Sequence, residues 1–172
     1  MILKKFGLYD CNPSSTPGDT LVILRKDNGN NEEAQKNIPY CKAVSSLMYL
    51  MLCTRPDIVN PMIKLVQYTS NFNNVHSTVV KHVFQYLKGS NDNVCTLGNV
   101  EKVNERNMTL SGACDSNWVE DLDDRQSTSG YIFMINSGMI SWQTKKQQMV
   151  AISTMQAEYQ ALSGAVKEAL WI

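Results

Sequence analysis

The sequence predicts a mixed α/β (α+β) fold, in which a small helical module precedes a strand-rich region that closes with a helix. Between residues 38 and 90, apolar side chains recur every three or four positions, which is the spacing of one helix face. From residue 93 the pattern changes to short β-rich runs between turn residues, and after residue 152 the helical spacing returns. Of the 172 residues, 43% are hydrophobic and 19% charged, as in a folded protein.

Residues 1–37 are expected to form an irregular segment that buries little surface alone. They contain the turn-forming stretch Asn12–Gly18 and one short apolar run, Leu21–Leu24, that is long enough for a strand. The first residues lack the apolar core and cleavage site of a secretory signal, so we expect an intracellular protein, with cytoplasm and nucleus both open.

Three short amphipathic helices are expected between residues 38 and 90. Their apolar stripes are Ala43, Val44, Leu47, Met48 and Met51; Ile58, Met62, Leu65 and Val66; and Val79, Val80, Val83, Phe84 and Leu87. Asn60 followed by Pro61 suits the start of the second helix. Ser77 is the expected cap of the third helix, which should end at Gly89. The stripes can bury one another, which predicts a helical module.

Three strands are expected in the next region. They are Met108–Asp115, Gly130–Ile135 and Met139–Gln143. Asn136-Ser-Gly between the last two predicts a hairpin, and the apolar run from Tyr131 predicts a strand that is covered on both faces. The final helix should begin at Ser153, because Ser153 and Gln156 have the spacing of a capping box.

Charge and cysteine content exclude several classes of protein. Sixteen basic and sixteen acidic residues argue against binding by bulk positive charge, although a local basic face stays open. No apolar run approaches the roughly 20 residues that cross a bilayer, so no membrane partner is expected. The five cysteines are scattered without a C-x-x-C pair, so we expect no disulfide partner. His76 and His82 lack zinc spacing and are expected on helix surfaces.

Two carboxylates could carry chemistry. Asp115 follows small and apolar residues where a strand should leave the core, and Glu158 shares a helix face with Leu162 and Ala165. An acid on a buried stripe costs several kcal/mol unless it is paired, neutral or bound to a metal. Structural alternatives stay open for both: Glu158 could favour the helix dipole or pair with a lysine, and Asp115 could end a strand. The acids at 121, 123 and 124 read as a solvated loop.

A series of short stretches covers nearly the whole chain. In order they are Lys5–Pro17, Ile38–Tyr40, Ser46–Leu50, Thr54–Ile58, Tyr86–Ser90, Asp115–Trp118, Asp123–Tyr131, Ile140–Gln147, Ala157–Tyr159 and Lys167–Trp171. In this order they resemble the polymerase–ribonuclease H junction of copia-type (pseudoviral) retrotransposon Pol polyproteins. The resemblance implies that residues 1–37 end the reverse transcriptase, 38–90 form a helical connection, and 93–172 begin a ribonuclease H-like domain of three antiparallel strands and its first helix.

The same resemblance implies a function and a site. The parent would copy RNA into DNA and hydrolyse the RNA strand of RNA–DNA hybrids, with Asp115 and Glu158 as catalytic ligands of two Mg²⁺ ions. Lys145 and Lys146 could contact phosphates, although a solvated lysine pair explains them as well. Three consecutive hydroxyl residues could contact the nucleic-acid backbone, although turn formation explains these too: Ser127, Thr128 and Ser129.

Within this resemblance the chain is a fragment. The polymerase aspartates would lie upstream and the later nuclease carboxylates downstream, in the remainder of the polyprotein, so the fragment should be inactive alone. Asn117 and Gln156 replace acidic residues of the family pattern, and the Asp115 strand should be an exposed edge that invites association. Two alternatives stay open: a non-catalytic nucleic-acid-binding module, and an unrelated soluble α/β domain.

Overall fold

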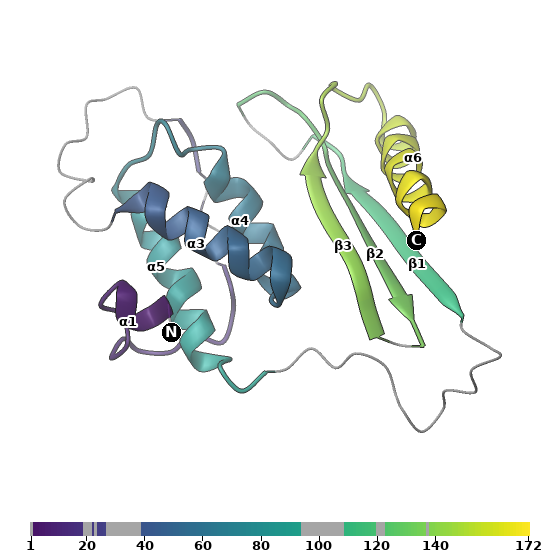
Figure 1. Cartoon of the computed structure of the whole chain (residues 1–172). Helices are drawn as coiled ribbons and strands as arrows, with labels where there is room; N and C mark the ends of the chain where they lie inside the picture. Colours follow the sequence, from purple (N-terminus) through teal and green to yellow (C-terminus); the bar gives the residue numbers. More distant parts are fainter. Residues whose placement is uncertain are drawn as a thin grey trace. The chain divides into compact units, whose positions relative to one another are not determined.

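The computed structural model describes residues 2–18, 22, 24–26, 39–93, 109–119, 123–136 and 138–172. The chain divides into two compact units, Met1–Asn93 and Val94–Ile172. In the described parts the first unit is helical, whereas the second contains a sheet and one helix (Figure 1). We call them the helical unit and the sheet unit.

The helical unit confirms the three expected helices. They are α3, Tyr40–Cys53; α4, Val59–Val66, which follows the short 3-10 helix η1, Pro56–Ile58; and α5, Asn74–Gly89. A further short helix, α1, spans Ile2–Lys5 and was not expected from the sequence.

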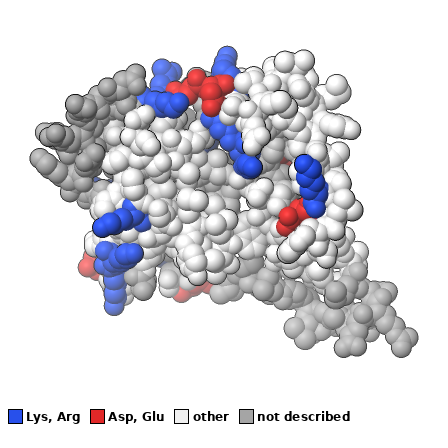
Figure 2. All heavy atoms as spheres, turned by 45° about the horizontal axis from the view of Figure 1, so that its top comes forward, with Lys and Arg blue, Asp and Glu red and all other residues white. Residues whose placement is uncertain are grey.

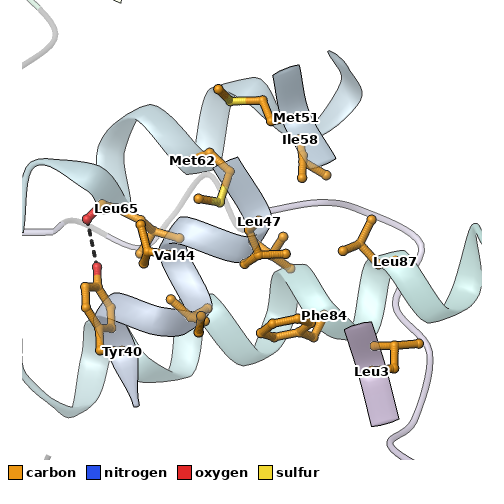
Figure 3. Packing of buried hydrophobic residues seen from close by; sticks show 13 residues of the cluster. Leu3, Tyr40, Val44, Leu47, Met51, Ile58, Met62, Leu65, Phe84 and Leu87 are labelled. Carbon is orange, nitrogen blue, oxygen red and sulfur yellow. Dashed lines mark hydrogen bonds between the residues drawn. The ribbon is translucent and has the colours of Figure 1, made fainter. Parts of the chain in front are cut away.

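The core of the helical unit consists of the predicted stripes packed against each other (Figure 3). Its buried residues are Leu3, Tyr40, Ala43, Val44, Leu47, Met51, Ile58, Met62, Leu65, Val80, Val83, Phe84 and Leu87. The Tyr40 hydroxyl donates to the Leu65 carbonyl at 2.8 Å and so joins α3 to α4 inside this core. Burial raises the pKa of Tyr40, so the hydroxyl keeps its proton and stays a donor.

The N-terminal segment belongs to the helical unit. Leu3 is buried in the core, and the Phe6 ring lies 5.1 Å from the Phe84 ring, centroid to centroid. The His82 ring lies 3.2 Å from the Ser14 hydroxyl. The strand predicted at Leu21–Leu24 lies mostly outside the described residues.

Three sequence predictions about helix starts and histidines are wrong. Helix α4 begins at Val59, which leaves Pro61 in the first turn, where a backbone N–H needs no partner within the helix. The cap of α5 is Asn73, because its side chain accepts from two backbone N–H groups and the His76 ring accepts from the Asn73 N–H. Ser77 therefore lies inside the helix, and His76 is buried rather than on the surface.

The sheet unit confirms the three antiparallel strands and the closing helix. Strands β1, Leu110–Asn117, β2, Thr128–Ile135, and β3, Gly138–Lys146, pair in the order β1-β2-β3, and helix α6 spans Thr154–Trp171. The predicted hairpin is confirmed: Ile135 pairs with Gly138, and the intervening Asn136 has φ 49°. Ser153 caps α6 as expected, while the Gln156 side chain accepts from the N–H of Ile152.

Helix α6 packs on one face of the sheet, against β1 and β2. The buried residues of this helix are Ala157, Ala161 and Ala165. On the sheet, Phe133 is the buried large side chain, and its ring lies over Gly112, where an added Cβ would overlap it. Among the described residues of β2 Phe133 is buried, and those on the opposite face, such as Ile132 and Met134, are partly buried, so coverage of this strand on both faces stays a prediction.

Two sequence expectations concern disulfides and membranes. The four described cysteines are free, and Cys95 lies outside the described residues. None of the described helices is both long enough and apolar enough to span a bilayer.

Candidate functional site

The residues that the sequence singled out lie near one end of the sheet, although not all on one face. Strand β1 ends and α6 begins at this end (Figure 1). Asp115 is paired with Gly130 across the β1–β2 ladder. On β2, the neighbouring Ser129 is opposite Lys145 of β3. Residues far apart in the sequence thus occupy adjacent ladder positions.

Asp115 is exposed and lies on the face of the sheet that α6 leaves open. Side chains alternate between the two faces along a strand, so Asp115 shares a face with its partner Gly130, and Cys114 shares the other face with Tyr131. Helix α6 lies on the Tyr131 face, because the Gln147 side chain bonds both to Ser129, which shares that face, and to the Ala157 carbonyl of α6. Burial and the nearby carboxylate of Glu168 in α6 raise the pKa of Tyr131. The Ser141 hydroxyl also donates to Glu168, at 2.7 Å.

Glu158 is exposed near the start of α6, and its predicted place on a buried stripe is wrong. The helix buries the stripe that begins one residue earlier, at Ala157, whereas Leu162 is 49% exposed. Successive helix residues are about 100° apart, so this small shift turns Glu158 toward solvent. Its position therefore carries no burial cost that a metal would have to offset.

The two acids therefore lie at the same end of the sheet but on different sides of β1. Strand β1 is at the edge of the described sheet, so no further described strand separates its two faces there. In the described part of the chain, no group of three or more His, Cys, Asp or Glu residues is placed to hold a metal. Asp115 and Glu158 offer the oxygen ligands that Mg²⁺ prefers, but they lie on different faces of the sheet, and the described residues add no third ligand beside them.

The two lysines differ in their surroundings. Lys145 is exposed, whereas the Lys146 ammonium lies 2.7 Å from the Asp124 carboxylate. Because this ion pair offsets the charge of Lys146, Lys145 is the better placed of the two for a phosphate. Asp123 and Asp124 are exposed as predicted, and Asp121 lies outside the described residues.

Two of the three hydroxyl residues at the start of β2 have structural partners. Ser127 is fully buried, and its hydroxyl accepts from the Val119 N–H at 3.2 Å. The Ser129 hydroxyl accepts from the Gln147 amide at 2.7 Å. Thr128 is partly exposed. Contacts of Ser127 and Ser129 with a ligand would thus compete with bonds that hold the sheet unit together.

Sequence reasoning missed Gln147. This residue follows β3, is buried, and bonds to both β2 and α6 through its side chain. The only signal was its place at the end of the Ile140–Gln147 stretch, which by itself points to no role.

Sequence reasoning also missed a polar network in the helical unit. The Arg55 guanidinium donates to the Asp57 carboxylate at 2.9 and 2.7 Å, and the Tyr86 hydroxyl donates to the same carboxylate at 2.7 Å. Burial opposes ionisation of Asp57, but the hydrogen bonds from Arg55 and Tyr86 outweigh it and lower the pKa of the carboxyl. The Thr54–Ile58 and Tyr86–Ser90 stretches, noted separately in the sequence, therefore meet in one network that joins η1 to α5.

Sequence similarity to two transposon polyproteins extends over almost the whole chain. It is 35% identical over 175 residues to the "Retrovirus-related Pol polyprotein from transposon TNT 1-94" of Nicotiana tabacum, a match with 99% of this chain and 13% of that protein. It is 32% identical over 171 residues to the corresponding polyprotein from transposon RE2 of Arabidopsis thaliana, a match with 99% of this chain and 11% of that protein. The chain belongs to the family of copia-type retrotransposon Pol polyproteins, as the order of its motifs predicted.

A third relative has a different kind of name. The chain is 41% identical over 137 residues to "Secreted RxLR effector protein 161" of Plasmopara viticola, a match with 80% of this chain and 93% of that protein. No protein-family model matches the chain, and no solved structure does.

Proposed function

We propose that the chain joins the end of a reverse transcriptase to the first part of a ribonuclease H-like domain. The parent polyprotein would copy RNA into DNA and hydrolyse the RNA strand of RNA–DNA hybrids. The observation that carries the proposal is the order of elements in the sheet unit. Three antiparallel strands precede a helix, and an acid from the first strand and an acid from the helix lie at one end of the sheet.

In this proposal Asp115 and Glu158 hold Mg²⁺ at the free edge of β1. Both are exposed, so neither carboxylate loses much hydration before it meets an ion. When bound, the ions would supply stabilisation of charge on the phosphodiester oxygens. Lys145 would hold a neighbouring phosphate, and the 2′-hydroxyl would mark the RNA strand in the minor groove of the hybrid.

The chain by itself is proposed to be inactive, because two carboxylates hold magnesium loosely and position it poorly. The remaining ligands would come from the rest of the polyprotein, of which this chain corresponds to about an eighth. Its partners would thus be this remainder and the hybrid.

Cleavage of a labelled RNA–DNA hybrid in Mg²⁺ tests the proposal. The purified chain should leave the hybrid intact, and a chimera that adds the following segment of the tobacco polyprotein should cleave it. Asp115→Asn and Glu158→Gln should each abolish cleavage by the chimera, whereas Asp92→Asn, a matched change of an exposed acid in the helical unit, should not. Cleavage by the chimera that survives both site changes would overturn the proposal.

The distribution of charge favours a second candidate, a non-catalytic nucleic-acid-binding role for the helical unit. Residues 1–93 contain ten basic and seven acidic residues, and residues 94–172 contain six and nine. On the face drawn in Figure 2, Lys and Arg side chains form separate groups rather than one continuous patch. Such a surface supports weak binding that salt would screen. Retention of labelled hybrid on a filter at low but not high salt would support this role, and no retention at low salt would exclude it.

We further propose an intracellular location. The Plasmopara viticola relative, by contrast, is named as a secreted protein. Expression of the tagged chain, followed by fractionation of cells and medium, distinguishes an intracellular from a secreted location. Recovery of the chain from the medium would contradict an intracellular location.

A further inference from the structure

We infer that two copies of the chain pair through the outer side of α6, with the two helices antiparallel about a two-fold axis. The occupant of this surface is therefore a second copy of the same chain. The inference is independent of the proposed function, because it uses the packing of the helix and neither of the two acids.

The outer side of α6 carries five large apolar side chains that stay exposed in the described structure. They are Met155, Tyr159, Leu162, Val166 and Leu170, which we call the outer stripe, and they are between 47 and 84% exposed. Successive helix residues differ by about 100° in direction, so the outer stripe lies nearly opposite the alanines that face the sheet. The helix thus has two apolar sides, and the sheet covers one of them.

The spacing of the outer stripe suits contact with another helix. Its residues follow one another at intervals of 4, 3, 4 and 4 positions. Alternation of three and four is the spacing of a coiled-coil seam, in which two helices bury their apolar stripes against each other. The charged residues of α6 are Glu158, Lys167 and Glu168, and none belongs to the stripe. Covering the stripe therefore removes no charged member of it from water.

The outer stripe also matches its own reverse. Met155 and Leu170 are equally far from the point between residues 162 and 163, and so are Tyr159 and Val166. A two-fold axis at that point brings Met155 of each copy opposite Leu170 of the other, and Tyr159 opposite Val166. A closed two-fold interface needs a surface that is complementary to itself in this way. This symmetry is the reason to assign the surface to a second copy.

Side-chain size and the helix dipole favour the antiparallel order. In a parallel pair each residue would meet its own copy, so Tyr159 would face Tyr159 and Val166 would face Val166. Large would then oppose large and small would oppose small, which crowds one level and leaves another underfilled. The antiparallel pair sets Tyr159 against the smaller Val166. It also places the positive end of each helix dipole beside the negative end of the other.

The exposed area is close to what a dimer needs. At these exposed fractions the outer stripe presents roughly 700 Å² per copy, compared with about 800 Å² per partner in a standard protein interface. Ile152 and Ile172, just beyond the two ends of the stripe, are exposed as well and extend the apolar surface. An interface of this size, at the small end of the range, predicts a dimer that forms reversibly.

Sedimentation of the full chain over a range of concentrations tests the inference. The wild type should convert from a monomer of 19.3 kDa to a species of twice that mass. Leu162→Glu places two like charges beside the two-fold axis and should raise the dissociation constant of the dimer at least about tenfold. Lys167→Gln is the matched control, because it changes the net charge by the same amount at an exposed position outside the stripe. This control should dimerise like the wild type.

An exchange of charges tests the antiparallel order. Tyr159→Glu alone and Val166→Lys alone should each weaken the dimer, because each sets a charge against an apolar side chain. The double variant Tyr159→Glu/Val166→Lys brings opposite charges together in the antiparallel pair. It should therefore dimerise at least about tenfold more tightly than either single variant. In a parallel pair like charges would meet, and the double variant would be the weakest of the three.

The outcomes are as follows. A wild-type chain that stays monomeric overturns the inference and leaves the outer stripe to another segment of the polyprotein. Dimerisation of Leu162→Glu with wild-type affinity also overturns it, as does growth into larger species without a dimer, because a two-fold interface closes at two copies. Failure of the double variant to recover affinity overturns the antiparallel order. Tryptophan fluorescence shows whether each variant is folded; should Leu162→Glu unfold, wild-type affinity in Leu170→Gln would overturn the inference instead.

Discussion

The helical unit and the sheet unit use their apolar side chains in opposite ways. The helical unit buries large side chains from α1, α3, η1, α4 and α5 in one cluster. In the described part of the sheet unit the buried apolar residues are Phe133 and four alanines: Ala151, Ala157, Ala161 and Ala165. The outer side of α6 leaves large apolar side chains exposed, among them Met155, Tyr159, Leu162, Val166 and Leu170. Since burial of apolar surface is the main stabilising contribution, the sheet unit should be the less stable of the two.

The largest expected effect tests how far the stability of the sheet unit depends on the Phe133 ring. Phe133→Ala should cost about 3–5 kcal/mol, which should unfold a unit with so few large buried groups. All three tryptophans, Trp118, Trp142 and Trp171, belong to this unit, so fluorescence reports its unfolding in urea. Ile140→Ala, at an exposed position in β3, is the control and should change the midpoint little.

A leucine in the core of the helical unit provides the counterpart. Leu47→Ala should cost about 2–5 kcal/mol because Leu47 is fully buried, whereas Leu52→Ala on the same helix should cost far less because Leu52 is 61% exposed. In Leu47→Ala, the helical circular dichroism signal should be lost at a lower urea concentration than in the wild type. The urea midpoint of tryptophan fluorescence should not change. Equal effects of the two leucines would contradict the core as described.

Removal of a helix cap should lower the stability of each unit by a similar amount. Asn73→Ala removes the side-chain acceptor at the start of α5, and Ser153→Ala removes the one at the start of α6. Each should cost about 1 kcal/mol, measured by urea unfolding with the probe that suits its unit. A cost for Ser153→Ala near zero would mean that the start of α6 is held by Gln147 rather than by its cap.

Acid should weaken the helical unit through Asp57. A carboxyl whose pKa is lower in the folded chain adds stability above its unfolded pKa, about 3.9, and that contribution is lost as pH falls through the folded value. Asp57→Asn should therefore cost about 0.2–1 kcal/mol at pH 7, a small value because water screens this partly exposed pair. The difference from wild type should shrink below about pH 4; a difference that grows in acid would contradict the sign.

The smallest effect on stability concerns the exposed side of α6. Leu170→Gln should change the free energy of unfolding by no more than about 0.5 kcal/mol, because Leu170 is 84% exposed. Exposed apolar surface favours association, so sedimentation should show less self-association in the variant than in the wild type. Lys167→Gln, on the same helix at an exposed position, should leave association unchanged.

Periodicity predicted the elements well and their surroundings less well. The stripe around Leu47 was predicted and is buried, because the apolar stripes of the three helices pack against each other. For α6 the same reasoning placed Glu158 on the buried side, and the structure buries Ala157 instead. A helix with apolar residues on two sides does not reveal in its sequence which side meets the sheet.

The sequence by itself determined the three helices of the helical unit, the three antiparallel strands, the hairpin at Asn136 and, through the order of its motifs, the family. Only the tertiary structure decided that Asp115 and α6 lie on different faces of β1, that Gln147 links β2 to α6, and that Arg55, Asp57 and Tyr86 form one network. The reason is physical. Local spacing defines a side chain's direction about its own helix or strand, whereas its partners depend on how separate elements pack in space.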